Sequence, residues 1–352
     1  MAAGADRSAG RAFVGSFTSA GGRGIVAAAV DPETGALTET GVSDAVVDPS
    51  YLAAVTTNAG TVLHAVSETP DGAVAAFDAT GAAPRPIGRR VPVGGGHPTH
   101  LTVSQGHLLT ANYGSGSVSV LPVGTDGTPG PPAGVLRHEG AGPVFERQDG
   151  PHVHQVLPDP TGRWILSVDL GTDSVRICAL DTAAGALVPH RETALRPGTG
   201  PRHLAFHPDG RHVYVLAELE PVVTVCRWDA SAGLLEPVRE TAVVPDCAVR
   251  AVYPSAPVVA HDGRHLWAAV RGHDSIAVLS LDPTGERAAL VTMVPCGGRW
   301  PRDLALDPTG RRLYAANERS GDVTWFSIDA ATGIPHPTGT LAVPAASCVV
   351  FA

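Results

Sequence analysis

Chemically reactive residue types recur at a fixed distance from the glycine turns of this sequence. Four turns contain Gly162, Gly210, Gly263 and Gly310, which are 48, 53 and 47 residues apart. The positions eight residues before or after these glycines and the earlier Gly60 hold His154, Arg202, Arg302, Glu68, Glu218, Arg271 and Glu318. Taken singly, each residue suits a solvated or salt-bridged corner. Their recurrence in one register favours a shared polar site, because imidazole, carboxylate and guanidinium groups together transfer protons and stabilise oxyanions.

Two shorter units and a neighbouring histidine add candidate substrate-binding residues. The same register falls near Asn112 in one unit and near Asp169 in the next. The stretch "PHVHQVLPDP" places His152 two residues before His154, which is the alternation of a strand. The pair suits zinc ligands, a general acid/base or hydrogen-bonded structural histidines. No further ligand lies nearby at metal spacing, so we assign no metal or other cofactor, and we expect His203 to be structural.

The elements that position these residues are short strands in a repeated unit. A Gly turn, a strand, a polar corner and a second strand ending near Asp recur, as in "DPTGRWILSVDLGTDSVRICALD" and "HPDGRHVYVLAELEPVVTVCRWD". Seven units of about 50 residues fill the 352-residue chain. We therefore predict an all-β fold, one seven-bladed β-propeller of four-stranded antiparallel blades over residues 1–352, with residues 1–10 as a disordered tail. The C-terminal "SCVVFA" is expected to pair with the N-terminal half-unit and close the ring.

The amino-acid composition agrees with many short strands and restricts the partners. The chain has 41 Gly, 31 Pro and a net charge of −9, and all 25 of its basic residues are Arg. Without a basic patch or tail, nucleic acid and anionic membranes are poor partners. Five widely spaced Cys argue against a disulfide framework. We expect a cytoplasmic monomer that binds a small anionic molecule.

Several stretches, taken in order, resemble one enzyme family over essentially the whole chain. They include "RQDGPHVHQVLPDPTGRW", "GPRHLAFHPDGRHVYVLAEL", "RGHDSIAVL" and "PRDLALDPTGRRLYAANERSGDV". The sequence is similar to the lactonase family of seven-bladed propellers, of the 6-phosphogluconolactonase type, and to carboxy-cis,cis-muconate lactonizing enzymes. The resemblance implies a propeller with its active site at one mouth of the channel.

The same resemblance implies which residues act. The active-site His, two Arg and Glu of the muconate-type enzymes fall on His154, Arg202, Arg271 and Glu218, which the register had already selected. The sequence departs from its relatives by having Ala217 and Val270 where they usually have Asn, and Ala256-Pro257-Val258 where many have Ala-Glu-Ile. These departures lie next to the predicted site and bear on the choice of substrate.

We therefore predict hydrolysis of a sugar lactone, with 6-phosphogluconolactone as the substrate. In this hypothesis Glu218 or His154 activates water and Arg202 stabilises the oxyanion, while Arg271 and Arg302 hold an anionic group. His152, Asn112 and Asp169 are further substrate-binding candidates. Two alternatives use the same residues: a carboxymuconate-type cycloisomerase, and a propeller that binds a ligand or protein without catalysis.

Overall fold

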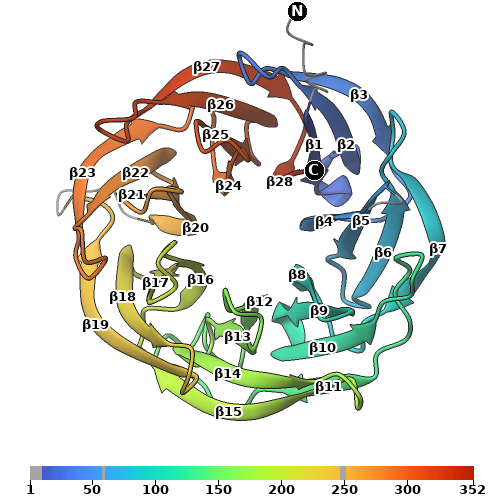
Figure 1. Cartoon of the computed structure of the whole chain (residues 1–352), viewed down its shortest axis with the longest axis horizontal. Helices are drawn as coiled ribbons and strands as arrows, with labels where there is room; N and C mark the ends of the chain where they lie inside the picture. The colour runs from blue at the N-terminus through green and yellow to red at the C-terminus, as the bar shows by residue number, and fades with distance from the viewer. Residues whose placement is uncertain (1–9, 58–59, 246–250) are drawn as a thin grey trace, which may run out of the picture.

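Seven four-stranded antiparallel sheets stand around a common central axis like the blades of a propeller (Figure 1). The computed structural model describes residues 10–57, 60–245 and 251–352. Within these residues the only helices are two short 3₁₀ turns, η1 (Thr18–Ala20) and η2 (Tyr113–Ser115). The predicted all-β propeller is confirmed. Of the predicted tail, residues 1–9 lie outside the described part of the chain, and Gly10 is already the first residue of a strand.

The first blade joins the two ends of the chain. It consists of β28 (Ala346–Phe351), β1 (Gly10–Ser16), β2 (Ile25–Val30) and β3 (Leu37–Ser43). Phe13 pairs with Val350 and Val14 with Val349 in the antiparallel β1–β28 ladder. The predicted closure of the ring by the C-terminal strand is therefore confirmed, and β1 is paired on both edges, with β28 on one side and β2 on the other.

The other six blades follow in chain order, each running from the channel outwards.
Blade 2 is β4 (Leu52–Thr57), β5 (Gly60–Ser67), β6 (Ala73–Asp78) and β7 (Arg85–Pro92). Blade 3 is β8 (Pro98–Ser104), β9 (His107–Asn112), β10 (Ser117–Pro122) and β11 (Gly134–Arg137). Blade 4 is β12 (Val153–Pro158), β13 (Trp164–Asp169), β14 (Ser174–Asp181) and β15 (Ala186–Ala194).

Blade 5 is β16 (Pro201–Phe206), β17 (His212–Ala217), β18 (Val222–Asp229) and β19 (Leu234–Ala242). Blade 6 is β20 (Tyr253–Val259), β21 (His265–Arg271), β22 (Ser275–Leu281) and β23 (Ala288–Pro295). Blade 7 is β24 (Pro301–Leu306), β25 (Arg312–Asn317), β26 (Asp322–Ile328) and β27 (Pro335–Ala342).

The hydrophobic core is divided into seven clusters, one between each pair of neighbouring blades. Adjacent residues of a middle strand serve different clusters: on β9, Leu108 packs toward blade 2 and Leu109 toward blade 4. This follows from the two-residue period of a strand, whose successive side chains face opposite sides of the sheet. Both faces of the middle strands are covered, so strands such as β9 and β17 are buried along their whole length, whereas outermost strands such as β7 and β19 are largely exposed.

The inner strands carry one-residue bulges at the same place in five blades, including blade 1, where Ser347 of β28 is left unpaired between Ala346 and Cys348. On β16, Pro201 pairs with Ala217 and His203 pairs with Leu216, which leaves Arg202 without a partner. Equivalent shifts leave Thr99, His154 and Arg302 unpaired on β8, β12 and β24. Because a bulge interrupts the alternation of a strand, it re-aims a side chain that would otherwise be buried between blades. The bulges thus place His154, Arg202 and Arg302 in one ring.

Polar side chains of the inner strands link successive blades around the channel. Each bond joins two neighbouring blades. Thr99 Oγ1 donates to the His154 carbonyl between blades 3 and 4 (3.2 Å), and Leu204 N–H donates to Gln155 Oε1 between blades 5 and 4 (2.7 Å). Blades 5, 6, 7 and 1 are joined by bonds from Arg202 Nη1 to the Ser255 carbonyl, from Ser255 Oγ to the Pro301 carbonyl (2.7 Å) and from Val349 N–H to Asp303 Oδ2 (3.2 Å). Such bonds satisfy buried polar groups and fix the inner strands relative to one another. The ring residues are therefore held on a rigid support.

Candidate active site

A single carboxylate, that of Glu218, lies among three guanidinium groups at one mouth of the channel. Its Oε2 is 2.7 Å from Arg271 Nη2 and 3.0 Å from Arg202 Nε, and its Oε1 is 2.6 Å from Arg147 Nη2. The Arg202 Nε–H does not point at the carboxylate, and this nitrogen has no hydrogen-bond partner. Arg202, Glu218 and Arg271 are almost fully buried, whereas the side chain of Arg147 is 35% exposed. We call these four residues the Glu218 group.

A second set of charges has the opposite composition. The Arg302 guanidinium lies between two carboxylates, 3.5 Å from Glu318 and 3.7 Å from Glu68. These contacts are longer than hydrogen bonds, and Oε2 of both glutamates is buried without a hydrogen-bond partner. The Phe17 ring covers the guanidinium at 4.8 Å from its centroid. Arg302, Glu68 and Glu318 form the Arg302 group, in which the positive charge is already compensated.

A chain of aromatic rings continues from the Glu218 group into the channel. His154 Nδ1 and His203 Nε2 are 3.1 Å apart and share a hydrogen bond, while His154 Nε2 has no partner among the described residues. The His203 ring lies edge-on to His100, with centroids 5.6 Å apart, and Tyr51 packs on His100 at 4.1 Å. His154 and His203 are buried. The Tyr113 ring also lies edge-on to His154, with centroids 5.6 Å apart, so the imidazole with a free nitrogen lies within a packed row of rings.

Burial and the arginines together set the protonation of these groups. Burial by itself raises the pKa of Glu218, but Arg271, Arg202 and Arg147 outweigh it and lower the pKa to about 2. Burial and the charge of Arg202 hold the pKa of both His154 and His203 well below the ordinary value. Burial and Arg271 lower the pKa of Arg202 to about 9. At neutral pH the site thus combines charged guanidiniums, an ionised carboxylate and neutral imidazoles.

The structure brings together the four residues predicted to act in catalysis. Arg202, Glu218 and Arg271 are in direct contact, and His154 lies within the electrostatic influence of Arg202 and Arg271. Ala217 and Val270, the departures from the family pattern, are buried strand residues that directly precede Glu218 and Arg271.

The side chains of the predicted substrate-binding residues Asn112 and Asp169 are instead committed to structural contacts, within blade 3 for Asn112 and within blade 4 and to the end of blade 3 for Asp169. Asn112 is fully buried, and its amide binds Ser117 and Ser119 while its oxygen accepts a bond from Thr110. Asp169 accepts bonds from the backbone N–H groups of His152 and Gly171, and its second oxygen pairs with buried His138 at 2.7 Å. These contacts leave both side chains as anchors of corners and loops rather than groups offered to the channel.

His152 does not repeat the environment of His154. It precedes β12, stacks on Tyr113 with ring centroids 4.5 Å apart, and places its nitrogens against the Tyr113 carbonyl and Asp149. Among the described residues, neither of these histidines belongs to a cluster with metal-ligand geometry. The pair therefore does not form the two-histidine edge of a metal centre at this mouth.

Two residues of the site, Arg147 and His203, do not lie eight residues from a turn glycine, so the repeat pattern did not predict them. Arg147 lies on the long connection between β11 and β12, where buried Gln148 ties the loop to the Leu170 carbonyl at 2.9 Å. His203, expected to be structural, faces His154 because the bulge at Arg202 turns the next side chain toward the channel as well. A bulge is invisible in a hydrophobicity pattern, so only the unusual run of polar residues at 202–203 hinted at it.

Comparison with known proteins places this arrangement in a family. Residues 11–351 match the family model described as "Lactonase, 7-bladed beta-propeller". The chain belongs to this lactonase family. It is 34% identical over 345 residues to 6-phosphogluconolactonase of Bacillus subtilis, an alignment that covers 96% of this chain and 97% of the relative. The predicted family, fold and lactonase class are confirmed.

Solved structures agree with this lactonase assignment. The periplasmic gluconolactonase of Pseudomonas aeruginosa has a TM-score of 0.89 and 28% identity, and the match covers 97% of this chain and 98% of that one. A protein from Lactobacillus plantarum has a TM-score of 0.91 and 26% identity, with 98% and 99% of the two chains covered. Family membership favours hydrolysis over the cycloisomerase and the non-catalytic propeller considered above.

Compartment and assembly remain predictions for this lactonase. No helix in residues 10–57, 60–245 or 251–352 has the length and apolar character needed to cross a bilayer. Cys178, Cys226, Cys296 and Cys348 are buried free thiols, and Cys247 lies outside the described residues. The Pseudomonas gluconolactonase is periplasmic, as its name states.

Proposed function

We propose that this lactonase hydrolyses 6-phosphogluconolactone to 6-phosphogluconate at the Glu218 group. The observation that supports the proposal is the charge of the site: one carboxylate is surrounded by three guanidiniums, beside a neutral imidazole with an unpaired nitrogen. Guanidinium forks suit phosphate and oxyanion oxygens, and a neutral imidazole accepts a proton. The 34% identical Bacillus subtilis relative carries the name of this activity.

His154, rather than Glu218, is the base in this proposal. A carboxylate whose pKa is lowered to about 2 has little affinity for a proton, and its oxygens are already used by arginines. His154 is neutral, because burial and the nearby arginines disfavour its charged form. A bound phosphate would offset those arginine charges and raise the proton affinity of the imidazole as the substrate arrives.

The reaction is a two-step acyl transfer to water. His154 Nε2 takes a proton from water as the water oxygen bonds to the lactone carbonyl carbon, and the tetrahedral oxyanion that forms is stabilised by Arg202. The bond from that carbon to the ring oxygen then breaks, and the protonated His154 returns its proton to the leaving oxygen. One water is consumed and a carboxylic acid and a hydroxyl are formed, so atoms and protons balance.

His203 and Glu218 act as positioning residues. With His154 Nδ1–H donating to His203 Nε2, the lone pair of His154 is on Nε2, where water is to be activated. Glu218 holds Arg271, whose Nε–H also donates to the Tyr253 carbonyl at 3.0 Å. Arg271 and the more exposed Arg147 are left to bind the phosphate, since their guanidiniums are anchored but face a single carboxylate.

A screen of lactones in a pH-stat tests the function. The rate of acid release is measured with 6-phosphogluconolactone and with unphosphorylated gluconolactone, each with and without a chelator. The molecular masses of the products are measured by mass spectrometry. We expect hydrolysis, seen as the gain of one water, with preference for the phosphorylated substrate. Equal rates for both lactones would overturn the phosphate assignment, and conversion without a change of mass would point to a cycloisomerase.

A further inference from the structure

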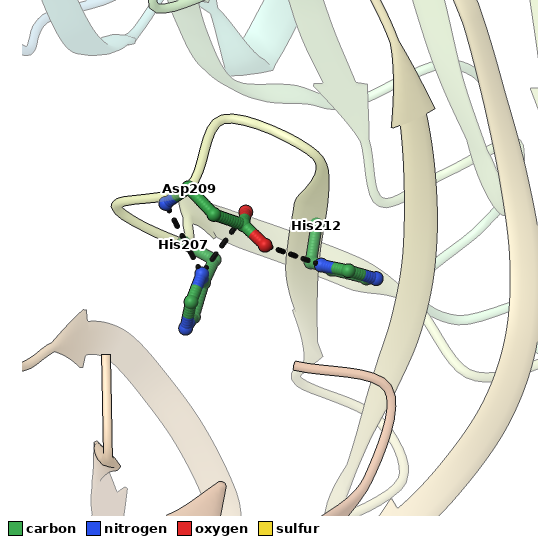
Figure 2. A group of neighbouring side chains, drawn as sticks. All are labelled: His207, Asp209 and His212. Atoms are coloured by element: carbon green, nitrogen blue, oxygen red, sulfur yellow. Dashed lines mark hydrogen bonds and ion pairs between the residues drawn. The ribbon is translucent and has the colours of Figure 1, made fainter. Parts of the chain in front are cut away.

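Two histidines and an aspartate gather at the face of blade 5 that is opposite the Glu218 group. His207 and Asp209 belong to the turn between β16 and β17, and His212 is the first residue of β17 (Figure 2). Among the described residues, this is the one group of three or more potential ligands whose donor atoms all lie within 4.8 Å of one another. Arg202 is at the start of β16 and His207 follows its end, a separation of roughly 17 Å along the strand. The cluster is therefore separate from the proposed active site.

The Asp209 carboxylate lies between the two imidazoles. Its Oδ1 is 3.0 Å from His207 Nδ1, and its Oδ2 is 3.0 Å from His212 Nδ1, as Figure 2 shows. Ligand atoms bound to a tetrahedral zinc ion at about 2.0–2.2 Å lie roughly 3.3–3.5 Å apart. Both His–Asp separations are within a few tenths of an ångström of such an edge. The third edge, between the two imidazoles, is within 4.8 Å, and their ring centroids are 6.1 Å apart, so the two rings must move toward each other to share one ion.

The orientation of His207 supports a ligand role. Its Nε2 is 3.0 Å from the Gly263 carbonyl, which only accepts hydrogen bonds, so Nε2 is the protonated nitrogen. In the neutral ring Nδ1 then carries a lone pair and faces both the Asp209 N–H, at 3.2 Å, and a carboxylate oxygen. A lone pair and a carboxylate oxygen at 3.0 Å repel unless a proton or a metal ion lies between them, and a metal ion takes the place of that proton when it binds. Ligating histidines in metal sites typically donate their other N–H to a carbonyl in this way.

The neighbouring blade holds both rings in place. A Cβ on Gly263 would lie 2.4 Å from His207 Nε2, and one on Gly285 would lie 2.8 Å from His212 Nδ1. Both glycines therefore leave space that the imidazoles fill. All three side chains are largely shielded, with exposures of 12%, 19% and 9% for His207, Asp209 and His212. The ligands are thus arranged before any ion binds, which lowers the entropic cost of binding.

We propose that His207, Asp209 and His212 form a binding site for a divalent transition-metal ion, with Zn²⁺ as the best match. Two imidazole nitrogens and one carboxylate oxygen suit zinc, and water completes the four-coordinate shell. On binding, the ring proton of neutral His212 moves from Nδ1, where it faces Asp209, to Nε2 by exchange with water, so no net proton is lost and Nδ1 presents a lone pair. The Asp209 N–H gives up its bond to His207 Nδ1. Since His207 also contacts blade 6 through Gly263, the bound ion stabilises the junction of blades 5 and 6.

Blade 6 contains a natural control for this site. Its turn reads "AHDGRH" where blade 5 reads "HPDGRH", so Ala260 stands at the position of His207. Asp262 is paired with Arg264 at 2.7 Å, whereas Asp209 lies 3.7 Å from the equivalent Arg211 and 3.0 Å from each of its two histidines. His265 occupies the position of His212 and is equally buried. Substituting His265 therefore removes a histidine of the same environment without touching the proposed ligands.

Titration of the chelator-stripped full-length protein with ZnCl₂ in a calorimeter tests the site. We expect one strong binding event in the wild type and in His265→Gln, and a loss of at least about 10-fold in affinity in His207→Gln and in His212→Gln. A wild-type dissociation constant weaker than about 100 µM, or equal affinities in all four proteins, would overturn the proposal.

A second measurement covers variants that fold poorly. Cobalt(II) added to the wild type is expected to give the intense visible absorption of a four-coordinate site, displaced by one equivalent of zinc, and zinc is expected to raise the melting temperature of the wild type. Weak octahedral absorption with no effect of zinc on melting would contradict the site, whatever the variants do. Neither readout depends on lactone hydrolysis, so its outcome is separate from that of the proposed function.

Discussion

The Glu218 group and the Arg302 group are built from the same residue types at equivalent positions, yet their charges are reversed. In the first, one carboxylate lies among three guanidiniums at 2.6–3.0 Å. In the second, one guanidinium lies between two carboxylates at 3.5 and 3.7 Å. The seven blades provide similar positions around the channel. Because the Glu218 group has more arginines than glutamates and the Arg302 group has more glutamates than arginines, the side of the channel with the Glu218 group is positive. This asymmetry gives an anionic substrate a single favourable orientation.

The largest expected effect separates two rival bases, His154 near the positive side and Glu68 in the Arg302 group. Burial raises the pKa of Glu68, and its Oε2 has no hydrogen-bond partner, so this carboxylate has a higher proton affinity than an ordinary glutamate and is a second candidate for the base. We expect His154→Ala to lower kcat by about 10²–10⁴-fold, because a positioned acid/base is lost, and Glu68→Gln to change it little. Steady-state kinetics on the hydrolysed lactone decide. The reverse pattern would move the base to the Arg302 group.

Next in size is the effect of each group on stability. Glu218→Gln leaves buried Arg202 and Arg271 without a counter-charge, and breaking a buried pair in this way costs about 3–5 kcal/mol. Glu318→Gln removes a longer contact, and Arg302 keeps Glu68, so a loss of about 1 kcal/mol or less is expected. Urea unfolding of both variants measures the difference. Equal losses would show that the short and long contacts are energetically alike.

The pH dependence of stability gives a smaller contrast of opposite sign. The pKa of Glu218 is lowered from 4.5 to about 2, so its stabilising contribution is present above pH 4.5 and is lost as pH falls toward 2. The pKa of Glu68 is raised, so its ionisation on the way to neutral pH opposes folding. We therefore expect the stability deficit of Glu218→Gln to shrink on acidification from pH 5 to pH 3.

Glu68→Gln is the counterpart in this pH series. The glutamine stays neutral, so the stability of this variant relative to the wild type is expected to improve as pH rises from 4 to 7. Chemical unfolding at several pH values measures both trends. Parallel curves for the two variants and the wild type would contradict the opposite environments of the two glutamates.

Much of this architecture can be predicted from the sequence. The features that cannot be predicted share one cause. The turn glycines have φ of 72°, 68°, 72° and 70° at Gly162, Gly210, Gly263 and Gly310, a conformation that glycine adopts without strain, so the unit length and blade count were readable. The ion-pair partner of each charged residue was not readable, because the pairing depends on strand bulges and on contacts between distant parts of the chain. Arg147 and Glu218, for example, are 71 residues apart in the sequence. Asn112 and Asp169 fit the register but are committed to structural contacts.

The central claim is that the positive side of the channel binds the anionic part of the substrate, and one comparison tests it directly. The ratio of kcat/KM for 6-phosphogluconolactone to that for unphosphorylated gluconolactone is measured in the wild type, Arg271→Gln and Arg302→Gln. A lost charge-assisted hydrogen bond, about 1.5–3 kcal/mol, predicts a ratio reduced roughly 10- to 150-fold in Arg271→Gln and nearly unchanged in Arg302→Gln. An unchanged ratio in Arg271→Gln, or the larger loss in Arg302→Gln, would contradict the account.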